Sequence, residues 1–420
     1  MWKLFDEIVG KTIECECGRV HIVPKIDFVF EDGISKNLGS FFKDEIFIAD
    51  KNTFPLVDVP GERVIVLNDS ERVLATMDRV KEVLKLLKEK KDLVSIGSGS
   101  LTDIARYASF LMGKNFSCFP TAPSVDAYTS SVSALIENGL KKTLKAVPPK
   151  RVVIDMDILV KAPFDLIRSG LGDMGAKVTA RLDWILSNFL NDEYICGLVW
   201  RLMRDPLKSM LKNTGNILKR KKEPFRNLVD TLLLSGITMT MVGNSRPASG
   251  AEHIISHFLE MYYEMNGRIP LLHGLQVAMG TFVSIKAYEV ILEDIPLRKS
   301  KISQEERENF LYETFGEKAK GFLEIYEKKR KKRNVDLASL KRVISPTYLE
   351  FKDTLLEHLK LLNLGELFSK FDLEFFRKAV IFSNSIRERY TVLDLLEELG
   401  ILEDFSHFVI DEIRQLGFFS

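Results

Sequence analysis

Five short apolar runs alternate with helical patterns in the first 160 residues of this chain, and comparable runs do not recur in the rest of its 420 residues. The runs are rich in β-branched and aromatic residues, and they occupy residues 46–49, 64–67, 93–96, 116–119 and 152–154. Continuously apolar strands separated by helices are typical of a parallel sheet that helices cover on both faces. We therefore predict that residues 1–160 form an α/β domain with a parallel sheet, the architecture that binds nucleotides.

Residues 161–420 carry apolar side chains at helical spacing and predict an all-helical second domain. Residues 249–252 and 391–394 each begin with Ser or Thr and end with Glu or Asp, the spacing of a capping box at a helix start. The longest stretches without Asp, Glu, Lys or Arg are residues 231–245 and 269–285. Both are shorter than the about 20 apolar residues of a membrane span, so they predict buried helices and no span.

The charges of the chain are balanced, with 60 Lys and Arg against 59 Asp and Glu. Nucleic-acid-binding proteins concentrate excess basic charge, so we expect no nucleic-acid partner. The one basic run, residues 328–333, alternates with Glu324 and Glu327 and predicts a solvated helix face. The N-terminus lacks the pattern of a signal peptide, so we expect a cytoplasmic protein.

The four cysteines are scattered except for Cys15 and Cys17, which gives no disulfide framework. Together with His21 this pair would make half of a zinc site, but no second Cys/His pair complements it in the sequence. A structural turn is the interpretation that the sequence favours here.

A glycine turn follows the third apolar run and contains Gly97, Ser98, Gly99, Ser100 and, three residues later, Asp103. Between a strand and a helix, such a turn lets the backbone approach a pyrophosphate, and the helix N-terminus offers amides and a positive dipole end. The spacing is not that of the usual dinucleotide fingerprint. A tight turn with Ser100 as N-cap and Asp103 closing a capping box would have the same pattern.

Asp50 follows the first apolar run and precedes Asn52 and Thr53. It stands where an acidic residue holds a ribose hydroxyl, although it comes before the glycine turn in the sequence. A carboxylate there would repel a 2′-phosphate, which favours NADH over NADPH. A turn or helix-cap aspartate is the alternative.

Three of the six histidines fall between residues 253 and 273. His253 and His257 are four apart and share a helix face, while His273 opens the next apolar helix. Imidazoles from two helices suit a divalent metal, and a carboxylate would complete a three-ligand set with an open position. Asp173, flanked by glycines and alanine, is the nearest attractive carboxylate. Hydrogen-bonded core histidines and a surface aspartate are the alternative.

Six motifs, taken in order, resemble the sn-glycerol-1-phosphate dehydrogenase family, which belongs to the dehydroquinate synthase-like, metal-dependent alcohol dehydrogenase superfamily. They are residues 97–103, 120–126, 170–177, 245–257, 273–277 and 389–391. The match extends from Ile46 to Leu396, and the run 245–257 is specific to the glycerol-1-phosphate branch. The resemblance implies an N-terminal nucleotide domain, a helical C-terminal domain, and reversible NAD(P)H-dependent reduction of dihydroxyacetone phosphate to sn-glycerol 1-phosphate.

Carried over residue by residue, the resemblance implies that Asp173, His253 and His273 bind one divalent metal ion. Such a nitrogen and oxygen ligand set accepts most first-row metals, so Zn²⁺ and Ni²⁺ both remain candidates.

The resemblance also implies a bound NAD(H) or NADP(H), with its pyrophosphate on residues 97–103 and its nicotinamide end near Thr121 and Ser124. Ser98 departs from the glycine that the family usually has at the second position of the turn. Gly97 and Gly99 remain for the close approach.

For the substrate, the resemblance places a hydroxyl on Asp126 and leaves His257 either to protonate the alkoxide or to contact the phosphate. Asn244, Ser245 and Arg246 offer an amide, a hydroxyl and a fork of donors for the phosphate. A structural salt bridge is the alternative role of Arg246.

Three other functions were weighed. A 3-dehydroquinate synthase has glutamate as its first metal ligand, where this chain has Asp173. A glycerol dehydrogenase shares the three ligands but lacks the run 245–253. A non-catalytic nucleotide-binding homologue has no physical reason to keep three ligands aimed at one point. We also expect a homo-oligomer, a dimer or larger.

Overall fold

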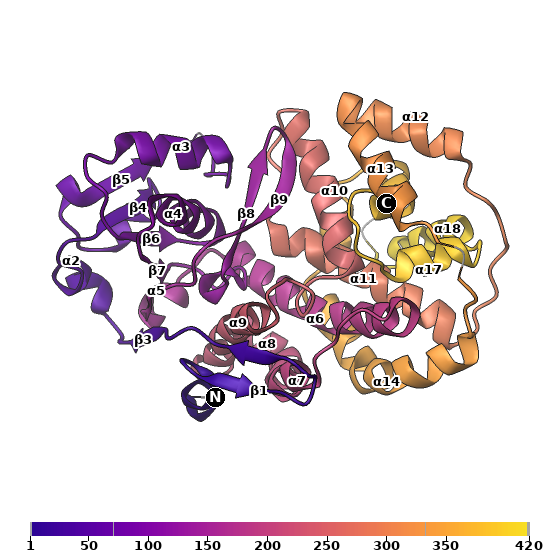
Figure 1. Ribbon diagram of the computed structural model, residues 1–420, viewed down its shortest axis with the longest axis horizontal. Coiled ribbons are helices and arrows are strands. Elements are labelled where there is room, and N and C mark those ends of the chain that lie inside the picture. The colour runs from indigo at the N-terminus through magenta and orange to yellow at the C-terminus, as the bar shows by residue number, and fades with distance from the viewer. Residues whose placement is uncertain (1, 70, 332, 418–420) are drawn as a thin grey trace. The chain divides into compact units, whose positions relative to one another are not determined.

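The computed structural model describes residues 2–69, 71–331 and 333–417 (Figure 1). The chain divides into two compact units, Met1–Met174 with Gly197–Ser245 and Gly175–Cys196 with Arg246–Ser420. One long helix, α6 (Phe164–Asn191), contributes residues to both units. The first unit therefore includes residues beyond the boundary expected at 160, because the helices of 197–245 pack within it.

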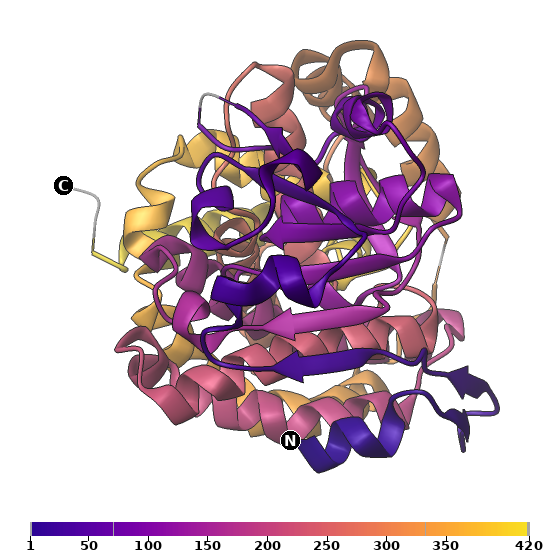
Figure 2. The same cartoon turned by 90° about the vertical axis from the view of Figure 1, so that its left-hand side faces the viewer.

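A six-stranded parallel sheet forms the centre of the first unit, and its arrowheads point the same way (Figure 2). In spatial order its strands are β3 (Asp27–Phe30), β10 (Arg151–Ile154), β7 (Phe116–Pro120), β6 (Leu93–Gly97), β4 (Ile46–Asp50) and β5 (Val64–Leu67). All five apolar runs of the sequence are strands of this sheet, so the predicted parallel sheet is confirmed. The partly exposed edge strand β3 was not expected from the sequence.

Helices cover both faces of the sheet. The short helices α2 (Leu38–Phe41) and α5 (Met156–Leu159) lie on the face where Phe42, Val94 and Ile96 form a core. On the other face α4 (Gly99–Met112) lies along β6 and β7, with α3 (Met77–Leu86) beside it (Figure 1). Every residue of β6 and β7 is buried, as expected of central strands in a covered parallel sheet.

Two hairpins were not expected from the sequence. They are β1 (Thr12–Glu14) with β2 (Val20–Ile22), and β8 (Val132–Glu137) with β9 (Leu140–Lys145). The second turns at Asn138 and Gly139, whose φ angles are 53° and 71°. Positive φ at both positions marks the two-residue turn for which Asn-Gly is the strongest sequence signal.

The remaining helices of the first unit are α1 (Trp2–Ile8), α7 (Gly197–Lys212), α8 (Thr214–Leu218) and α9 (Lys222–Val242). Helix α9 is buried over most of its length, as its uncharged second half predicts. It packs against α7 and against the 3-10 turn Ala127–Thr129.

The second unit consists of helices and turns throughout its described residues, so the all-helical second part is confirmed. Besides the end of α6 it contains α10 (Ala251–Met265), α11 (His273–Leu292), α12 (Gln304–Phe315), α13 (Ala319–Lys329), α14 (Leu337–Leu361), α15 (Leu364–Phe368), α16 (Leu373–Phe382), α17 (Val392–Glu398) and α18 (Leu402–Arg414). Helix α11 is long and apolar enough to cross a membrane, but 83% of its most apolar window is buried inside the protein. It is a core helix, as the sequence predicts.

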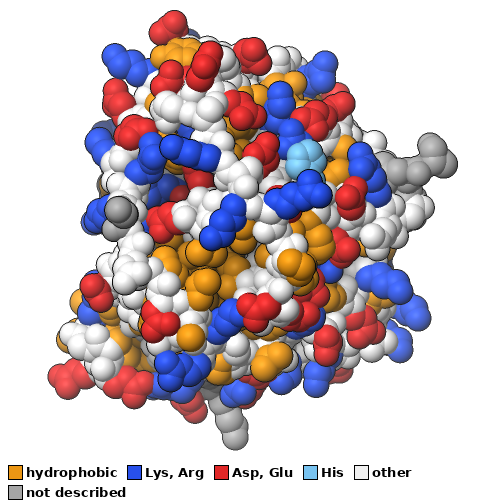
Figure 3. Space-filling view, turned by 90° about the vertical axis from the view of Figure 1, so that its right-hand side faces the viewer, with side chains coloured by type: hydrophobic (Ala, Val, Ile, Leu, Met, Phe, Trp, Pro, Cys, Tyr) orange, Lys and Arg blue, Asp and Glu red, His pale blue; other side chains and the backbone are white. Residues whose placement is uncertain are grey.

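The basic run 328–333 is solvated only in part: Lys328, Arg330 and Lys331 are exposed, as its charge pattern predicts, whereas Lys329 and Arg333 make less exposed ion pairs. Lys329 Nζ lies 2.6 Å from Asp394 Oδ1 with both side chains buried, and Arg333 pairs with Glu398. Acidic and basic side chains are also intermixed over the face shown in Figure 3, around a hydrophobic area near the centre of the view.

Candidate active site

The connections of the sheet reverse direction between β4 and β6. The chain passes from β4 outward to β5, but from β6 in the opposite direction to β7. In open α/β sheets the crevice at such a reversal is where nucleotides bind, at the carboxyl ends of the strands. Asp50 ends β4 and Gly97 ends β6, so two predicted nucleotide residues stand at these adjacent strand ends.

The glycine turn is tightly packed. A Cβ on Gly97 would lie 2.4 Å from Leu101 Cδ1, and one on Gly99 would lie 2.8 Å from Val125 Cγ2. Helix α4 begins at Gly99, and its N-cap Ser98 makes no side-chain cap bond in the described structure. The capping arrangement on Ser100 that would explain this motif without a ligand is therefore not formed.

Asp103 supports the neighbouring backbone through Arg106. Its Oδ1 accepts a 3.0 Å hydrogen bond from Nη1 of Arg106, which is fully buried. The guanidinium also donates to the carbonyls of Ala127, Tyr128 and Val132. Burial raises the pKa of Asp103 to about 6, with the charge of Arg106 opposing the rise. Asp103, which was expected at the cofactor, thus binds Arg106, and Arg106 holds the segment after β7 in place.

Asp50 forms a local turn. Its Oδ1 accepts 2.8 Å hydrogen bonds from the backbone amides of Asn52 and Thr53, and Thr53 Oγ1 accepts from the Asp50 amide at 3.0 Å. This is the turn aspartate that the sequence left open as the alternative to a ribose contact.

The segment after β7 holds Thr121 and Ser124, both buried. The Thr121 amide donates to Gly97 O at 3.2 Å, so the ends of β6 and β7 stay joined. Ser124 Oγ lies 3.4 Å from the hydroxyl of Tyr128, and Ser169 Oγ donates to the Ser124 carbonyl at 3.0 Å. Both residues expected near the nicotinamide therefore lie on a backbone that is hydrogen-bonded to its neighbours.

Two of the predicted site residues, Asp126 and Asp173, are hydrogen-bonded in the first unit. The backbone amide of Asp126 donates a 3.0 Å hydrogen bond to Oδ2 of Asp173, which is 1% exposed. Ser235 Oγ of α9 donates to Asp126 Oδ2 at 2.7 Å. Asp126 is therefore connected to α6 through its backbone and to α9 through its side chain.

Glycines allow this approach. A Cβ on Gly170 of α6 would lie 1.7 Å from the carbonyl oxygen of Pro123, and one on Gly236 of α9 would lie 2.7 Å from that of Asp126. Any side chain at these positions would push a helix away from the segment. Gly170, the first glycine of the motif that contains Asp173, is thus explained by packing.

The three clustered histidines meet in the second unit. Helices α10 and α11 pack closely at Gly280, where a Cβ would lie 2.4 Å from Glu252 O. The ring centroids of His253 and His273 are 5.3 Å apart, and that of His257 is 6.1 Å and 5.7 Å from these two. The helix pair therefore presents three imidazoles at one place.

Glu252 orients the His253 ring. Glu252 is fully buried, and its Oε1 lies 2.9 Å from His253 Nδ1 while its Oε2 accepts from Thr179 Oγ1 at 2.8 Å. A carboxylate that accepts from Nδ1–H leaves Nε2 with its lone pair, which is the form of histidine that binds metals. The sequence pattern indicated Glu252 only as a helix-capping residue, although its position directly before His253 was a signal for this role.

The start of α10 corrects one expectation. The helix begins at Ala251 with Gly250 as its N-cap, so Ser249 is not the cap residue. The Ala251 amide donates to Asp183 Oδ2 at 2.6 Å, and a Cβ on Gly250 would lie 2.4 Å from the same oxygen. Burial, and then the charge of Glu252, raise the pKa of Asp183. The expected capping box at Thr391 is confirmed.

Arg246 makes a structural ion pair. It is 1% exposed, and its Nε and Nη2 donate to the Glu193 carboxylate at 2.9 Å and 2.7 Å. Nη2 also donates to Tyr390 O at 2.9 Å. These contacts favour the salt-bridge role for Arg246. Asn244 is exposed and Ser245 half-buried in the same loop.

Another arginine, Arg387, stands beside one of the histidines. Nη2 of Arg387 lies 3.5 Å from His257 Nδ1, and burial lowers the arginine's pKa. Arg389 Nη1 donates to Ser249 O at 2.6 Å and so holds the loop before α10. Arg387 was not expected at the site from the sequence, because it lies two residues before the motif 389–391.

Comparisons with known proteins were made for the whole chain. Residues 62–163 match the model of the family described as iron-containing alcohol dehydrogenase. The chain is 33% identical over 307 residues to glycerol-1-phosphate dehydrogenase [NAD(P)+] of Geobacillus thermodenitrificans, covering 69% of this chain and 76% of the relative. It is 28% identical to the protein of the same name from Bacillus licheniformis, over 94% of each chain.

Among solved structures, the chain is similar to glycerol dehydrogenase from Schizosaccharomyces pombe, with a TM-score of 0.55 and 19% identity. The alignment covers 93% of this chain and 89% of that one. At this identity the likeness concerns the fold, a parallel-sheet domain followed by a helical region.

Proposed function

The chain belongs to the glycerol-1-phosphate dehydrogenase family, and from this membership we propose that it reduces dihydroxyacetone phosphate reversibly to sn-glycerol 1-phosphate with NAD(P)H. The protein is an NAD(P)-dependent oxidoreductase of a metal-dependent alcohol dehydrogenase fold. The observation that carries the proposal is the whole-length similarity to these relatives. The paired Glu252 and His253 at the histidine cluster support it.

Asp173, His253 and His273 hold one divalent ion, Zn²⁺ or Ni²⁺. The two histidines lie together in the second unit, and Glu252 keeps His253 in the metal-binding form. Asp173 stands on α6, about one and a half turns before Thr179, which bonds to Glu252. When bound, the ion supplies a Lewis acid that polarises the substrate carbonyl.

The nucleotide binds at the reversal of the sheet, with its pyrophosphate on residues 97–100 at the start of α4. The α4 amides and the crevice between β4 and β6 support this assignment. Thr121 and Ser124 border the nicotinamide, which supplies the hydride. Because Asp50 lies at the neighbouring strand end, NADH is the expected cofactor, with a 2′-phosphate disfavoured by its charge.

Asp126 binds a substrate hydroxyl, because its carboxylate is held by Ser235 while its backbone amide is bonded to the proposed metal ligand Asp173. His257 and Arg387 bind the phosphate together with Asn244 and Ser245. A guanidinium beside an imidazole offers the charged donors that a phosphate prefers. His257 is also the candidate donor of the alkoxide proton.

Arg246 acts on the phosphate only indirectly, as a positioning residue. Its ion pair with Glu193 and its bond to Tyr390 hold the loop that carries Asn244 and Ser245. The homo-oligomer and the cytoplasmic location stay predictions from the sequence.

One assay tests the function. NADH oxidation is followed with dihydroxyacetone phosphate, with dihydroxyacetone and, in the reverse direction, with glycerol, before and after metal removal. We expect strong preference for the phosphorylated ketone and loss of activity on chelation that Zn²⁺ or Ni²⁺ restores. Equal rates with dihydroxyacetone and its phosphate would instead indicate a glycerol dehydrogenase.

A further inference from the structure

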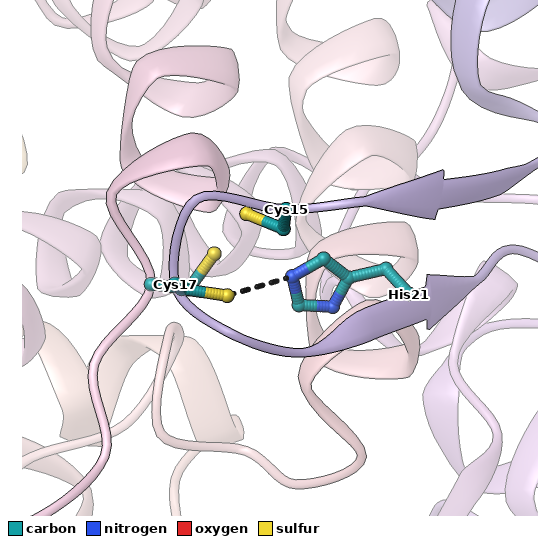
Figure 4. A group of neighbouring side chains, drawn as sticks. Cys15, Cys17 and His21 are labelled. Atoms are coloured by element: carbon teal, nitrogen blue, oxygen red, sulfur yellow. Dashed lines mark hydrogen bonds between the residues drawn. The ribbon is translucent and has the colours of Figure 1, made fainter.

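The hairpin of β1 and β2 holds two cysteines and a histidine that the proposed reaction does not use. Ile13 pairs with His21 across the hairpin, and its turn carries Cys15 and Cys17. The Gly18 amide closes the turn with a 2.9 Å hydrogen bond to Cys15 O. Figure 4 shows the three labelled side chains gathered at this turn.

The burial of β2 is the reverse of what a core strand would show. His21 is 1% exposed, whereas its neighbours Val20 and Ile22 are 58% and 70% exposed. A half-buried strand normally turns its apolar side chains inward. A two-stranded hairpin is marginally stable alone, so this one depends on its contacts with the rest of the first unit, among them those of β2 with α9.

The tautomer of His21 is fixed by its surroundings. Nδ1 lies 2.8 Å from the carbonyl oxygen of Met241 in α9, and a carbonyl can only accept. Nδ1 therefore carries the proton, and Nε2 directs its lone pair towards Cys17 Sγ at 3.4 Å. Metal-binding histidines characteristically donate their other ring nitrogen to a backbone carbonyl in this way.

The spacing of the donor atoms suits zinc. The ligand atoms of Cys15, Cys17 and His21 lie within 4.8 Å of one another. Zn–S of about 2.3 Å and Zn–N of about 2.0–2.1 Å at a tetrahedral angle separate sulfur and nitrogen by roughly 3.6 Å, close to the distance between Cys17 and His21. We propose that these three residues bind a Zn²⁺ ion distinct from the catalytic one.

Cys196 supplies the fourth ligand, which is the third thiolate. It directly precedes Gly197, the first residue of α7, and a Cβ on Gly197 would lie 3.5 Å from Glu16 Oε1. Arg201 of the same helix pairs with Glu16. The chain that carries Cys196 therefore passes beside the turn.

This site is structural. Three thiolates and one imidazole leave no open position for a substrate, and soft sulfur ligands select Zn²⁺ over the hard cations. The cysteine thiols lose their protons when the ion binds. The ion would fasten the hairpin to α9, whose Met241 carbonyl holds the His21 ring.

Cobalt substitution tests the proposal on the reduced full-length chain. Co²⁺ bound to thiolates gives an intense near-ultraviolet charge-transfer band, which a site of one aspartate and two histidines lacks. We expect the band in the wild type and in a His253→Ala/His273→Ala variant, and its loss in Cys17→Ser and His21→Ala. Cys118→Ser, at a buried cysteine outside the hairpin, is the matched control and should keep the band.

Two further measurements cover variants that fail to fold. Saturating Zn²⁺ should slow alkylation of Cys15 and Cys17 at least tenfold in the wild type, and Cys196→Ser should weaken Co²⁺ binding at least tenfold. Absence of the band in the reduced wild type, its persistence in Cys17→Ser, or equal alkylation with and without Zn²⁺ would overturn the site. Unchanged Co²⁺ affinity in Cys196→Ser would exclude the fourth ligand.

Discussion

The backbone amide of Asp126 donates a hydrogen bond to the side chain of Asp173 at 3.0 Å. The residue proposed to bind a substrate hydroxyl thus orients the residue proposed to bind the metal, but through its main chain. Its own carboxylate is engaged separately, by Ser235 at 2.7 Å. Changing the Asp126 side chain should therefore affect the substrate without disturbing the metal.

We predict that Asp126→Asn lowers kcat/KM for dihydroxyacetone phosphate by roughly 10- to 150-fold, because a charge-assisted hydrogen bond contributes about 1.5–3 kcal/mol. Metal content, measured by elemental analysis, should equal that of the wild type. Ser235→Ala is the control: it frees the carboxylate without removing it, and should cost less than Asp126→Asn. Loss of metal from Asp126→Asn would contradict the separation of roles.

Removal of each proposed ligand should abolish activity. Asp173→Asn, His253→Ala and His273→Ala are expected to lose the catalytic ion while circular dichroism stays that of the folded wild type. His257→Ala is the matched histidine control and should keep the ion, because its proposed role is at the substrate. Full activity of the wild type after chelation that elemental analysis shows to be complete would disprove metal dependence.

Glu252→Gln tests the orientation of His253. An amide at this position can present its own N–H to Nδ1, so the ring is no longer held in the metal-binding form. Loss of such an outer partner typically weakens metal binding about 10- to 100-fold. We expect that loss in a competition titration, with much of the activity recovered at saturating metal. Unchanged affinity would reduce Glu252 to a helix-capping residue.

We expect Gly99→Ala to weaken NADH binding at least tenfold. Two causes could produce this loss, and a second substitution, at Val125, distinguishes between them. A Cβ at residue 99 would crowd Val125, and it would also occupy space that a pyrophosphate needs. Gly99→Ala/Val125→Ala relieves only the crowding. We expect calorimetry to show that affinity stays low in the double variant. Full recovery would mean that the glycine serves packing alone.

The central strands could be predicted from the sequence because burial on both faces leaves continuous apolar runs, as in residues 46–49. The edge strand β3 begins with a charged residue and pairs with β10, which is distant in sequence. The hairpin β8–β9 pairs locally, but the charged residues of β9 obscure its strand pattern. Only the turn at Asn138 and Gly139 was a local signal, and it was readable.

The site residues also divide into those that a local sequence pattern predicts and those whose contacts come from distant parts of the chain. Scarce histidines beside glycines predicted a cluster, and the three rings do lie together. The sequence could not show that Glu193 pairs with Arg246, because these residues are 53 positions apart and no motif contains both of them. Nor could it show which carbonyl holds His21, since Met241 is 220 positions away.

The last prediction concerns the phosphate group, because it is what distinguishes dihydroxyacetone phosphate from dihydroxyacetone as a substrate. Arg387→Gln removes the guanidinium beside His257, and one charge-assisted bond contributes about 1.5–3 kcal/mol. We expect kcat/KM for dihydroxyacetone phosphate to fall roughly 10- to 150-fold, and that for dihydroxyacetone to change little.

Arg246→Ala is the counterpart, since Arg246 is bound to Glu193 and Tyr390. Leaving these acceptors without their donor should lower the free energy of unfolding by about 1–3 kcal/mol. It should also reduce the kcat/KM values of both ketones by the same factor, because the loop itself is loosened. The opposite result would be a selective fall of kcat/KM for dihydroxyacetone phosphate in Arg246→Ala, with no change in Arg387→Gln. That result would reverse the two assignments and make Arg246 the phosphate ligand.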